Sequence, residues 1–240
     1  MKKILCLVLA MSMGSVAFAA EYRTKQPIAH DWLKINGNQF NIESANERGH
    51  ICGAQGKMDK NKVWKDGEGC QISFQFKGDE VKVDAEGCDN YCGAGVSFPS
   101  DYYKLPQVCS QQGVKKMENR FQTTLRSEKF EQAADIKQNY LKQCGDFLNP
   151  IETVTAANDA ADAYRQANNK AACIQTLDAV QDHYESELLD KDLVNKINVQ
   201  MERDKALRQQ CSGTLTKRSL EGRLKSKCVL YDGLYYCRWS

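Results

Sequence analysis

The first half of the chain takes its fold from the stretch Cys70-Gln-Ile-Ser-Phe-Gln-Phe-Lys-Gly-Asp-Glu-Val-Lys-Val-Asp84. At its start, three apolar residues alternate with polar ones, which is the period of a half-buried β-strand. Gly78 and Asp79 are typical turn residues, and Val81 and Val83 then alternate with charged residues, as a returning strand should. The stretch therefore predicts an antiparallel β-hairpin.

Shorter segments with the same alternation lie on both sides of this hairpin. They are separated by clusters of Gly, Asn and Asp at a spacing of roughly ten residues, which is typical of a small all-β domain. The predicted strands contain Phe40 and Ile42, His50 to Gly53, and Lys62 to Trp64. We expect residues 20–112 to form a small, disulfide-bridged antiparallel β sandwich or barrel.

The hydrophobic pattern changes to a helical period after Gly113. The third of five predicted helices has the clearest start, because Asn149 can cap it, Pro150 fits the first turn and Glu152 can complete a capping box. The predicted helices contain Met117 to Leu125, Phe130 to Cys144, Asn149 to about Ala167, Ala172 to Leu188, and Lys191 to Gln210 with Gly213 just beyond. The expected fold class is α+β, with a helical-hairpin domain at residues 113–213.

Two segments that join predicted helices share a pattern: Leu125-Arg-Ser-Glu-Lys-Phe-Glu-Gln-Ala133 and Tyr164-Arg-Gln-Ala-Asn-Asn-Lys-Ala-Ala-Cys-Ile174. Each carries an aromatic or small residue where one helix must approach the next. Through these segments, residues 114–210 resemble tetratricopeptide-type (TPR-like) repeats, although Ala133 and Cys173 are 40 residues apart and the family repeat is about 34. The resemblance implies packed helical hairpins and a protein-binding groove, with an ordinary helical bundle as the alternative.

The amino terminus is typical of a secretion signal. Lys2 and Lys3 precede a short apolar run, and Ala17 to Ala19 form a small-x-small cleavage site. Cleavage near Ala19 would remove residues 1–19 and with them Cys6, leaving ten of the eleven cysteines. An even number of thiols in an oxidising compartment predicts a disulfide framework, so we expect a periplasmic or secreted protein. No later stretch approaches the ~20 apolar residues of a membrane helix, so we expect no membrane insertion after cleavage.

The carboxyl terminus, residues 214–240, predicts a β-hairpin. Asp-Gly lies at the centre of Cys228-Val-Leu-Tyr-Asp-Gly-Leu-Tyr-Tyr-Cys237 and favours a two-residue type I′ turn. Counting outward places Cys228 opposite Cys237 at a non-hydrogen-bonded position, where a disulfide fits. The tyrosines of these strands, Tyr231, Tyr235 and Tyr236, form either a partly exposed aromatic patch or a packing contact with one of the domains.

The other cysteines are harder to pair from spacing. Cys144 and Cys173 lie on helix faces in adjacent hairpins, and we predict a second bridge between them. The remaining six allow 15 pairings, namely those among Cys52, Cys70, Cys88, Cys92, Cys109 and Cys211. If the five cysteines of the β domain pair among themselves, one of them has no partner, and it would form a disulfide with Cys211.

The composition and motifs argue against several function classes. The 33 basic and 31 acidic side chains are spread evenly, without the basic stripe that a nucleic-acid partner requires. We find neither a nucleophile elbow nor a His-Glu-x-x-His motif, and we expect no enzyme activity and no cofactor. A zinc site formed by Cys88 and Cys92 with His50 and Cys52 is the alternative to structural disulfides, which exported thiols usually form.

The first functional hypothesis is an inhibitor. The segments Gly69 to Phe74, Gly87-Cys88 and Tyr91 to Gly93 are similar, in domain size and bridged strands, to secreted lysozyme-inhibitor-like domains. The resemblance implies a protein partner, such as a lysozyme-like envelope hydrolase, that an inhibitor or immunity-type protein would block. Polar and aromatic side chains on a cysteine-tethered loop are the candidate contacts, namely Asp89, Asn90, Tyr91, Ser97, Asp101, Tyr102 and Tyr103.

The second hypothesis is an envelope structural or assembly adaptor that holds a partner in its helical repeats. Its groove would be lined by polar side chains of the helices, namely Arg126, Asn158, Asp162, Arg165 and Asn169. A common concave surface formed by these residues would favour the adaptor.

Overall fold

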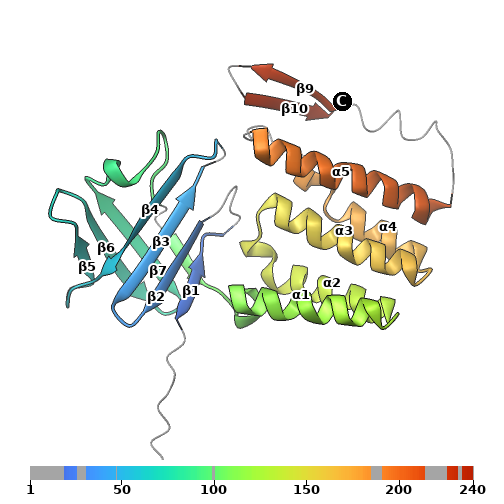
Figure 1. Ribbon diagram of the computed structural model, residues 1–240, viewed down its shortest axis with the longest axis horizontal. Coiled ribbons are helices and arrows are strands. Elements are labelled where there is room, and N and C mark those ends of the chain that lie inside the picture. The colour runs from blue at the N-terminus through green and yellow to red at the C-terminus, as the bar shows by residue number, and fades with distance from the viewer. Residues whose placement is uncertain are drawn as a thin grey trace, which may run out of the picture.

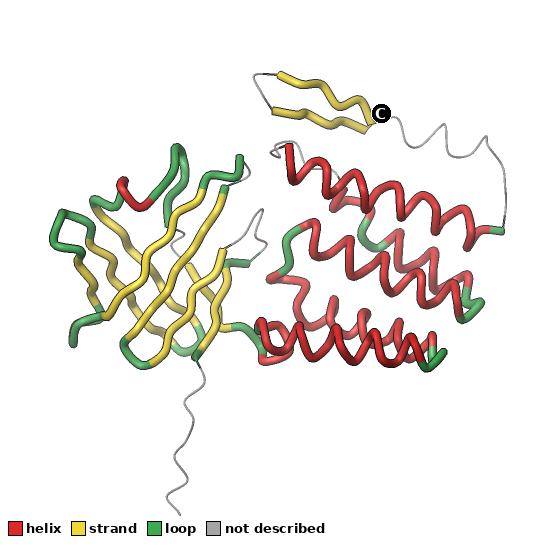
Figure 2. Tube along the Cα trace, viewed as in Figure 1, coloured by secondary structure: helices red, strands yellow, loops and turns green. Residues whose placement is uncertain are grey.

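The computed structural model describes residues 19–25, 31–46, 48–98, 101–184, 191–213, 226–231 and 234–239, the last two ranges as backbone only. A β-barrel and a layer of helices lie side by side, with a β-hairpin near the last helix (Figures 1 and 2). The predicted signal segment lies outside the described residues, apart from Ala19.

The described part of the first half contains eight antiparallel strands that form a nearly closed barrel (Figure 1). Neighbouring strands in the sheet are also neighbours in the sequence, except that β1 pairs with β8; β4 and β5 are the two edges. The strands are β1 (Ala20–Arg23), β2 (Asp31–Asn36), β3 (Gln39–Ala45), β4 (Ile51–Lys57), β5 (Val63–Lys65), β6 (Gln71–Lys77), β7 (Glu80–Glu86) and β8 (Asp101–Lys104). Of the two predicted architectures, a sandwich or a barrel, the structure has the barrel.

The predicted hairpin is confirmed in register. Residues Lys77 and Glu80 pair across the Gly78-Asp79 turn, and Phe74 lies opposite Val83. Alternate residues of the strands point inward and fill the barrel, because each strand buries one face only. The interior contains Leu33, Ile35, Phe40, Ile42, Ile72, Phe74, Val81, Val83 and Tyr102.

The gap between the edge strands β4 and β5 is filled by Trp64. Its indole packs where a Cβ on Gly56 would lie, 2.3 Å from the indole nitrogen. The Trp64 ring also makes edge contacts with Phe40 and Tyr91, each with ring centroids 5.6 Å apart. Only glycine therefore fits at position 56, and an aromatic side chain replaces the missing strand pairing.

Five α-helices follow in the described residues (Figure 2). A short 3-10 turn, Gly145–Phe147, lies between the second and the third of them. The predicted capping box is confirmed: Asn149 accepts from the backbone N–H of Glu152, and Glu152 accepts from that of Asn149. The helices are α1 (Gln111–Arg126), α2 (Phe130–Cys144), α3 (Pro150–Gln166), α4 (Lys170–Asp178) and α5 (Lys191–Ser212).

The fourth helix is shorter than predicted. It ends at Asp178, and the 3-10 turn η4 (Gln181–Tyr184) follows, so His183 lies in a turn and not inside a helix. The Tyr184 hydroxyl accepts a hydrogen bond from the buried Asn158 side chain, 3.2 Å away. This tertiary bond favours a turn that directs Tyr184 into the core over a continued helix.

The α1–α2 and α3–α4 hairpins have the same turn, 40 residues apart. Glu128 and Asn168 both have left-handed backbones, with φ of 58° and 59°. The backbone hydrogen bonds of the two turns match as well: Lys129 donates to Thr124, and Asn169 donates to Tyr164. The second half therefore contains two similar helical hairpins.

A buried lysine connects the helices. Lys137 of α2 lies 2.6 Å from a Glu118 oxygen of α1 and 2.8 Å from an Asp159 oxygen of α3. Asp159 also pairs with Arg203 of α5 at 2.7 Å. The Lys137 side chain is only 5% exposed, so four helices share one largely buried ionic network.

Polar contacts between the barrel and the helices fix the amino-terminal ends of α1 and α3. Glu21 of β1 accepts from the Gln111 backbone N–H at 2.8 Å, at the first residue of α1. Arg23, also in β1, pairs at 3.1 Å with Glu152, which completes the capping box of α3. A carboxylate at each position suits the positive end of a helix dipole.

The described residues contain four disulfides, which are Cys52–Cys92, Cys70–Cys88, Cys109–Cys144 and Cys173–Cys211. The predicted Cys144–Cys173 bridge is wrong. The sulfur of Cys144 faces the turn before α1, whereas Cys173 faces α5, because α2 and α4 pack against different neighbours. Cys211 is thus not tied to a leftover thiol of the barrel.

The carboxyl-terminal hairpin has the predicted backbone register. Strand β9 (Ser226–Tyr231) pairs with β10 (Leu234–Trp239), and Cys228 lies opposite Cys237. The side chains of these strands lie outside the described part of the chain. The Cys228–Cys237 disulfide and the placement of the tyrosines stay predictions.

Candidate functional site

The segment 87–98, which we name the tethered loop, joins β7 to β8 at one end of the barrel. Cys88 bonds to Cys70 before β6, and Cys92 bonds to Cys52 in β4. The Gly93 N–H donates to the Ile51 carbonyl at 2.9 Å. The Ser97 carbonyl accepts from the Ser44 hydroxyl at 3.0 Å, and Phe98 is buried in the barrel. Covalent and hydrogen bonds therefore hold the loop along its whole length.

Glycine makes the entry to this loop possible. Gly87 has a φ of +66°, and a Cβ there would lie 2.5 Å from the Gly69 carbonyl oxygen. Any larger residue would push apart the chain segments that the Cys70–Cys88 disulfide holds together.

Three of the predicted contact residues are exposed on the loop: Asp89, Asn90 and Ser97. Tyr91 is half-buried, because its ring packs against Trp64 and its hydroxyl is hydrogen-bonded to Asp66. Desolvation and the Asp66 carboxylate raise the pKa of the Tyr91 phenol, so it stays protonated as a donor. Tyr91 therefore supports the loop more than it offers a contact.

The other three predicted contacts do not lie on a loop. Asp101, Tyr102 and Tyr103 form part of β8, which pairs with both β1 and β7 and so completes the sheet. Tyr102 is fully buried in the barrel core. The amine of Lys25 lies over the Tyr103 ring, 4.6 Å from its centroid. These residues hold the barrel together, and Tyr102 is inaccessible to a partner.

An exposed apolar residue adjoins the loop, which the sequence reasoning missed. Ile51 is 59% exposed at the start of β4, the strand that contacts the η1 turn (Asp89–Tyr91). The neighbouring His50 ring lies against Gly93 and shares a hydrogen bond with the Ala94 carbonyl. Ile51, Asp89 and Asn90 therefore project from a cross-linked base.

The disulfides also decide the zinc alternative. The sulfurs of Cys52, Cys88 and Cys92 are all used in disulfides and are not free thiolates. Within the described residues, no group of three or more His, Cys, Asp or Glu side chains could hold a metal ion.

No described helix combines the length and hydropathy of a membrane span.

One of the side chains proposed for an adaptor groove does not reach the surface. Asn158 is fully buried, and its amide donates to the Tyr184 hydroxyl and to the Gln200 carbonyl. Asp162 pairs with Arg165 on the same helix. Asn169 caps α4. Asn158 therefore cannot line a groove. A groove role for Arg126, Asp162, Arg165 and Asn169 stays a prediction.

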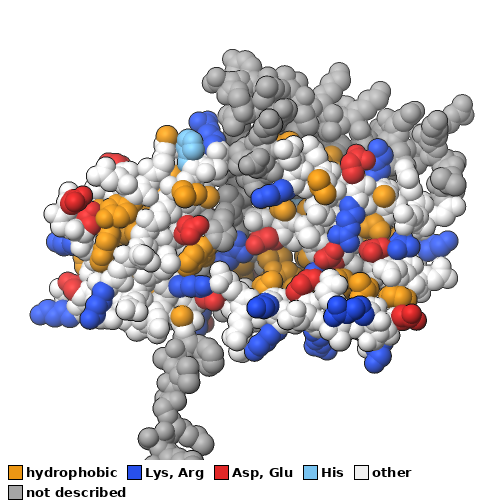
Figure 3. All heavy atoms as spheres, viewed as in Figure 1, with side chains coloured by type: hydrophobic (Ala, Val, Ile, Leu, Met, Phe, Trp, Pro, Cys, Tyr) orange, Lys and Arg blue, Asp and Glu red, His pale blue; other side chains and the backbone are white. Residues whose placement is uncertain are grey.

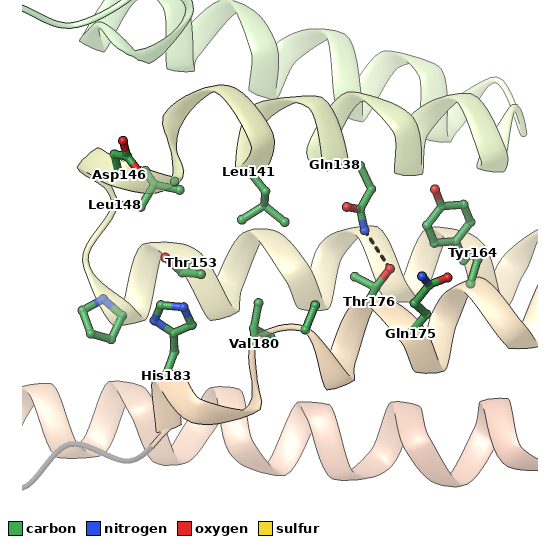
Figure 4. A pocket seen from close by; sticks show the side chains of 14 residues that line it. Gln138, Leu141, Asp146, Leu148, Thr153, Tyr164, Gln175, Thr176, Val180 and His183 are labelled. Carbon is green, nitrogen blue, oxygen red and sulfur yellow. Dashed lines mark hydrogen bonds between the residues drawn. The ribbon is translucent and has the colours of Figure 1, made fainter. Parts of the chain in front are cut away.

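A groove of about 950 Å³ lies between α2 and α4, and α3 runs along its base (Figure 4). Leu148, Thr153 and Val180 are buried at its floor. The Gln138 amide bridges its walls by donating to the Thr176 hydroxyl at 2.7 Å. Because its lining comes from three helices, no single sequence segment indicates it.

On the face seen in Figure 3, basic and acidic side chains are interspersed over the barrel and the helices.

No protein-family model matches the chain, and neither a curated protein nor a solved structure is similar to it. The class that the geometry supports is a disulfide-bridged barrel followed by helices, consistent with an extracellular or periplasmic protein.

Proposed function

We propose that this chain is an exported protein-binding protein that presents its tethered loop to a partner, as an inhibitor or immunity-type protein against an envelope-acting hydrolase such as lysozyme. The observation that carries the proposal is an exposed loop fixed by two disulfides beside the 59% exposed Ile51. Residues 1–19 would direct export and be removed near Ala19.

Rigidity is the physical reason for this choice. A loop that is already ordered loses little conformational entropy on binding, so more of its contact energy appears as affinity. An exposed apolar side chain with polar neighbours is also the arrangement of a binding hot spot, in which a central anchor is surrounded by a polar rim. Here Ile51 would be the anchor, and Asp89 and Asn90 the rim.

Inhibition assays with matched variants test the proposal. Ile51→Asp should weaken inhibition of a susceptible lysozyme-type hydrolase about tenfold or more, as loss of a hot spot does. Val199→Asp is the control, because Val199 is similarly exposed, at 65%, but lies on α5. Equal inhibition by both variants would show that the tethered loop is not part of the binding surface.

The alternative function is an envelope adaptor that binds a partner through its TPR-like helical hairpins. The α2–α4 groove and the repeated turn of the hairpins support it. Thr176→Trp would fill this groove at the Gln138 bridge. Loss of partner capture in this variant, with capture kept in Ile51→Asp, would favour the adaptor over the inhibitor.

A further inference from the structure

A second groove, of about 860 Å³, lies between α1 and α2 and is closed at one end by the turn η2 (Gln107–Cys109). The η2 turn can pack this closely against α1 because residue 113 is glycine. A Cβ there would lie 2.1 Å from the Gln107 carbonyl oxygen. The buried Met117 and Tyr140 and the half-buried Ile136 line its floor. This α1–α2 groove is separate from the tethered loop and from the α2–α4 groove.

The α2 wall of the groove carries a row of carboxamides. Gln132, Asn139 and Gln143 line it and are exposed. Their spacing of seven and four residues places them on one stripe of the helix. At 1.5 Å per residue, the row is roughly 16 Å long, which matches about five residues of an extended chain.

Carboxamides have the same hydrogen-bonding groups as a peptide backbone. Each offers N–H donors and a carbonyl acceptor, so it can satisfy both the C=O and the N–H of an extended segment that has no strand neighbour. A row of them along a groove is therefore chemically matched to a peptide main chain.

The α1 wall adds positive charge. Gln112, Lys116 and Arg120 follow one another at intervals of four residues and are exposed along the groove. Among the described residues, neither Lys116 nor Arg120 forms an ion pair, in contrast to the buried Lys137. The one acidic residue of the lining, Asp135, accepts a hydrogen bond from the Tyr164 hydroxyl at 3.3 Å. The groove thus has two cations available to carboxylates.

We infer that the α1–α2 groove binds an extended acidic segment of a partner protein. The amides of α2 bind the main chain, Lys116 and Arg120 bind acidic side chains, and the apolar floor takes an intervening apolar side chain. This inference goes beyond the proposed inhibitor function and uses none of its contact residues, so either can fail without the other.

Fluorescence anisotropy of labelled peptides with the full oxidised protein tests it. The probe is a blocked peptide of alternating Glu and Leu, about five residues long to match the groove. A peptide with Gln in place of Glu tests the charges. A peptide with Pro in place of Leu keeps the charge but loses backbone N–H groups, and so tests the amide row.

We expect saturable binding of the Glu-Leu peptide that weakens with salt, and about tenfold weaker binding by Lys116→Glu or Arg120→Glu. Lys115→Glu is the matched control, because Lys115 is exposed beside Lys116 but does not line the groove. It should change the affinity less than about twofold. Asn139→Leu should weaken binding of the Glu-Leu peptide more than that of the Glu-Pro peptide.

Three results would overturn the inference: no binding of the Glu-Leu peptide, equal binding of its Gln counterpart, or equal effects of Lys115→Glu and Lys116→Glu. Circular dichroism of each variant shows whether it is folded, and these exposed positions are expected to tolerate substitution.

Discussion

The barrel and the helices use their disulfides differently. In the barrel, a single apolar core joins all the strands, and both disulfides fasten the tethered loop at one end. The helical half has several smaller apolar clusters and a largely buried ionic network around Lys137. One of its disulfides joins η2 to α2, and the other joins α4 to α5. We therefore expect the barrel core to hold its fold while its disulfides shape a surface, and the helices to depend on their cross-links for the fold itself.

The largest expected change in unfolding free energy comes from removing the Cys173–Cys211 disulfide. This bond joins residues 38 apart, and loop-closure entropy assigns it about 4 kcal/mol of unfolding free energy. The double variant Cys173→Ser with Cys211→Ser should lose helical circular dichroism at lower urea concentrations than the wild type. The fluorescence of Trp64, measured with Trp32 and Trp239 replaced by Phe, should change at the same urea concentration with and without the disulfide.

A coincident shift of both signals would contradict the contrast, because it would show one cooperative unit. The control is the Cys70→Ser with Cys88→Ser pair, whose bond closes a shorter span of 18 residues in the barrel.

Removing the buried charge of Lys137 comes next. Lys137→Met keeps much of the side-chain volume but leaves Asp159 and Glu118 without their shared cation, which should cost about 3 kcal/mol. Urea unfolding measures this loss. Arg165→Met is the control, because the Arg165–Asp162 pair is about one-third exposed and should contribute less than about 1 kcal/mol. Equal losses would show that the ionic network does not stabilise the helices.

The edge gap of the barrel gives a smaller effect. Gly56→Ala places a methyl group against the Trp64 indole and should destabilise the barrel by about 2 kcal/mol, with a change in Trp fluorescence. Gly53→Ala, in the same strand, meets no atom within 4 Å and should change stability by less than about 0.5 kcal/mol. If Gly56→Ala is as stable as Gly53→Ala, Trp64 does not close the gap.

The smallest expected effect concerns pH. Desolvation would raise the pKa of Asp66, but hydrogen bonds from the backbone N–H groups of Glu68, Cys70 and Gly69 and from Tyr91 outweigh it and lower the pKa. Its carboxylate therefore stabilises the fold above about pH 4, the unfolded value, and this contribution is lost as the pH falls through the folded pKa.

Thermal unfolding of Asp66→Asn across this acid range measures the effect. The wild type should exceed the variant in stability most clearly above about pH 4, and the difference should shrink in acid. A constant difference at all these pH values would contradict the role of the carboxylate.

Local signals predicted much of the fold. The alternation in residues 70–84 and the Asn149 capping box each act within a few residues, and the structure confirms both. The predicted pairing of Tyr231 with Leu234 is confirmed as well, while the Asp-Gly turn between them lies outside the described residues. Strand β2 also carried a readable signal that we missed, since Leu33 and Ile35 alternate with polar residues.

The remainder depends on contacts between distant segments. Nothing near Tyr102 indicates that β8 closes the barrel against β1, so this tyrosine looked like a loop residue. The partner of Cys173 is set by the return of α5. Asn158 is polar yet buried, because Tyr184 and Gln200 satisfy its amide N–H groups. Spacing along the chain contains none of this information.

The most direct test of the central claim is residual activity of several purified lysozyme-type hydrolases, each mixed with the oxidised wild type or with a variant in which Cys52, Cys70, Cys88 and Cys92 are all replaced by Ser. The predicted result is tight inhibition by the wild type that the variant loses, since its tethered loop is no longer fixed while the two disulfides of the helices stay intact. Inhibition that survives in the variant, or no inhibition of any of these hydrolases by the wild type, would contradict a binding role for the disulfide-fixed loop.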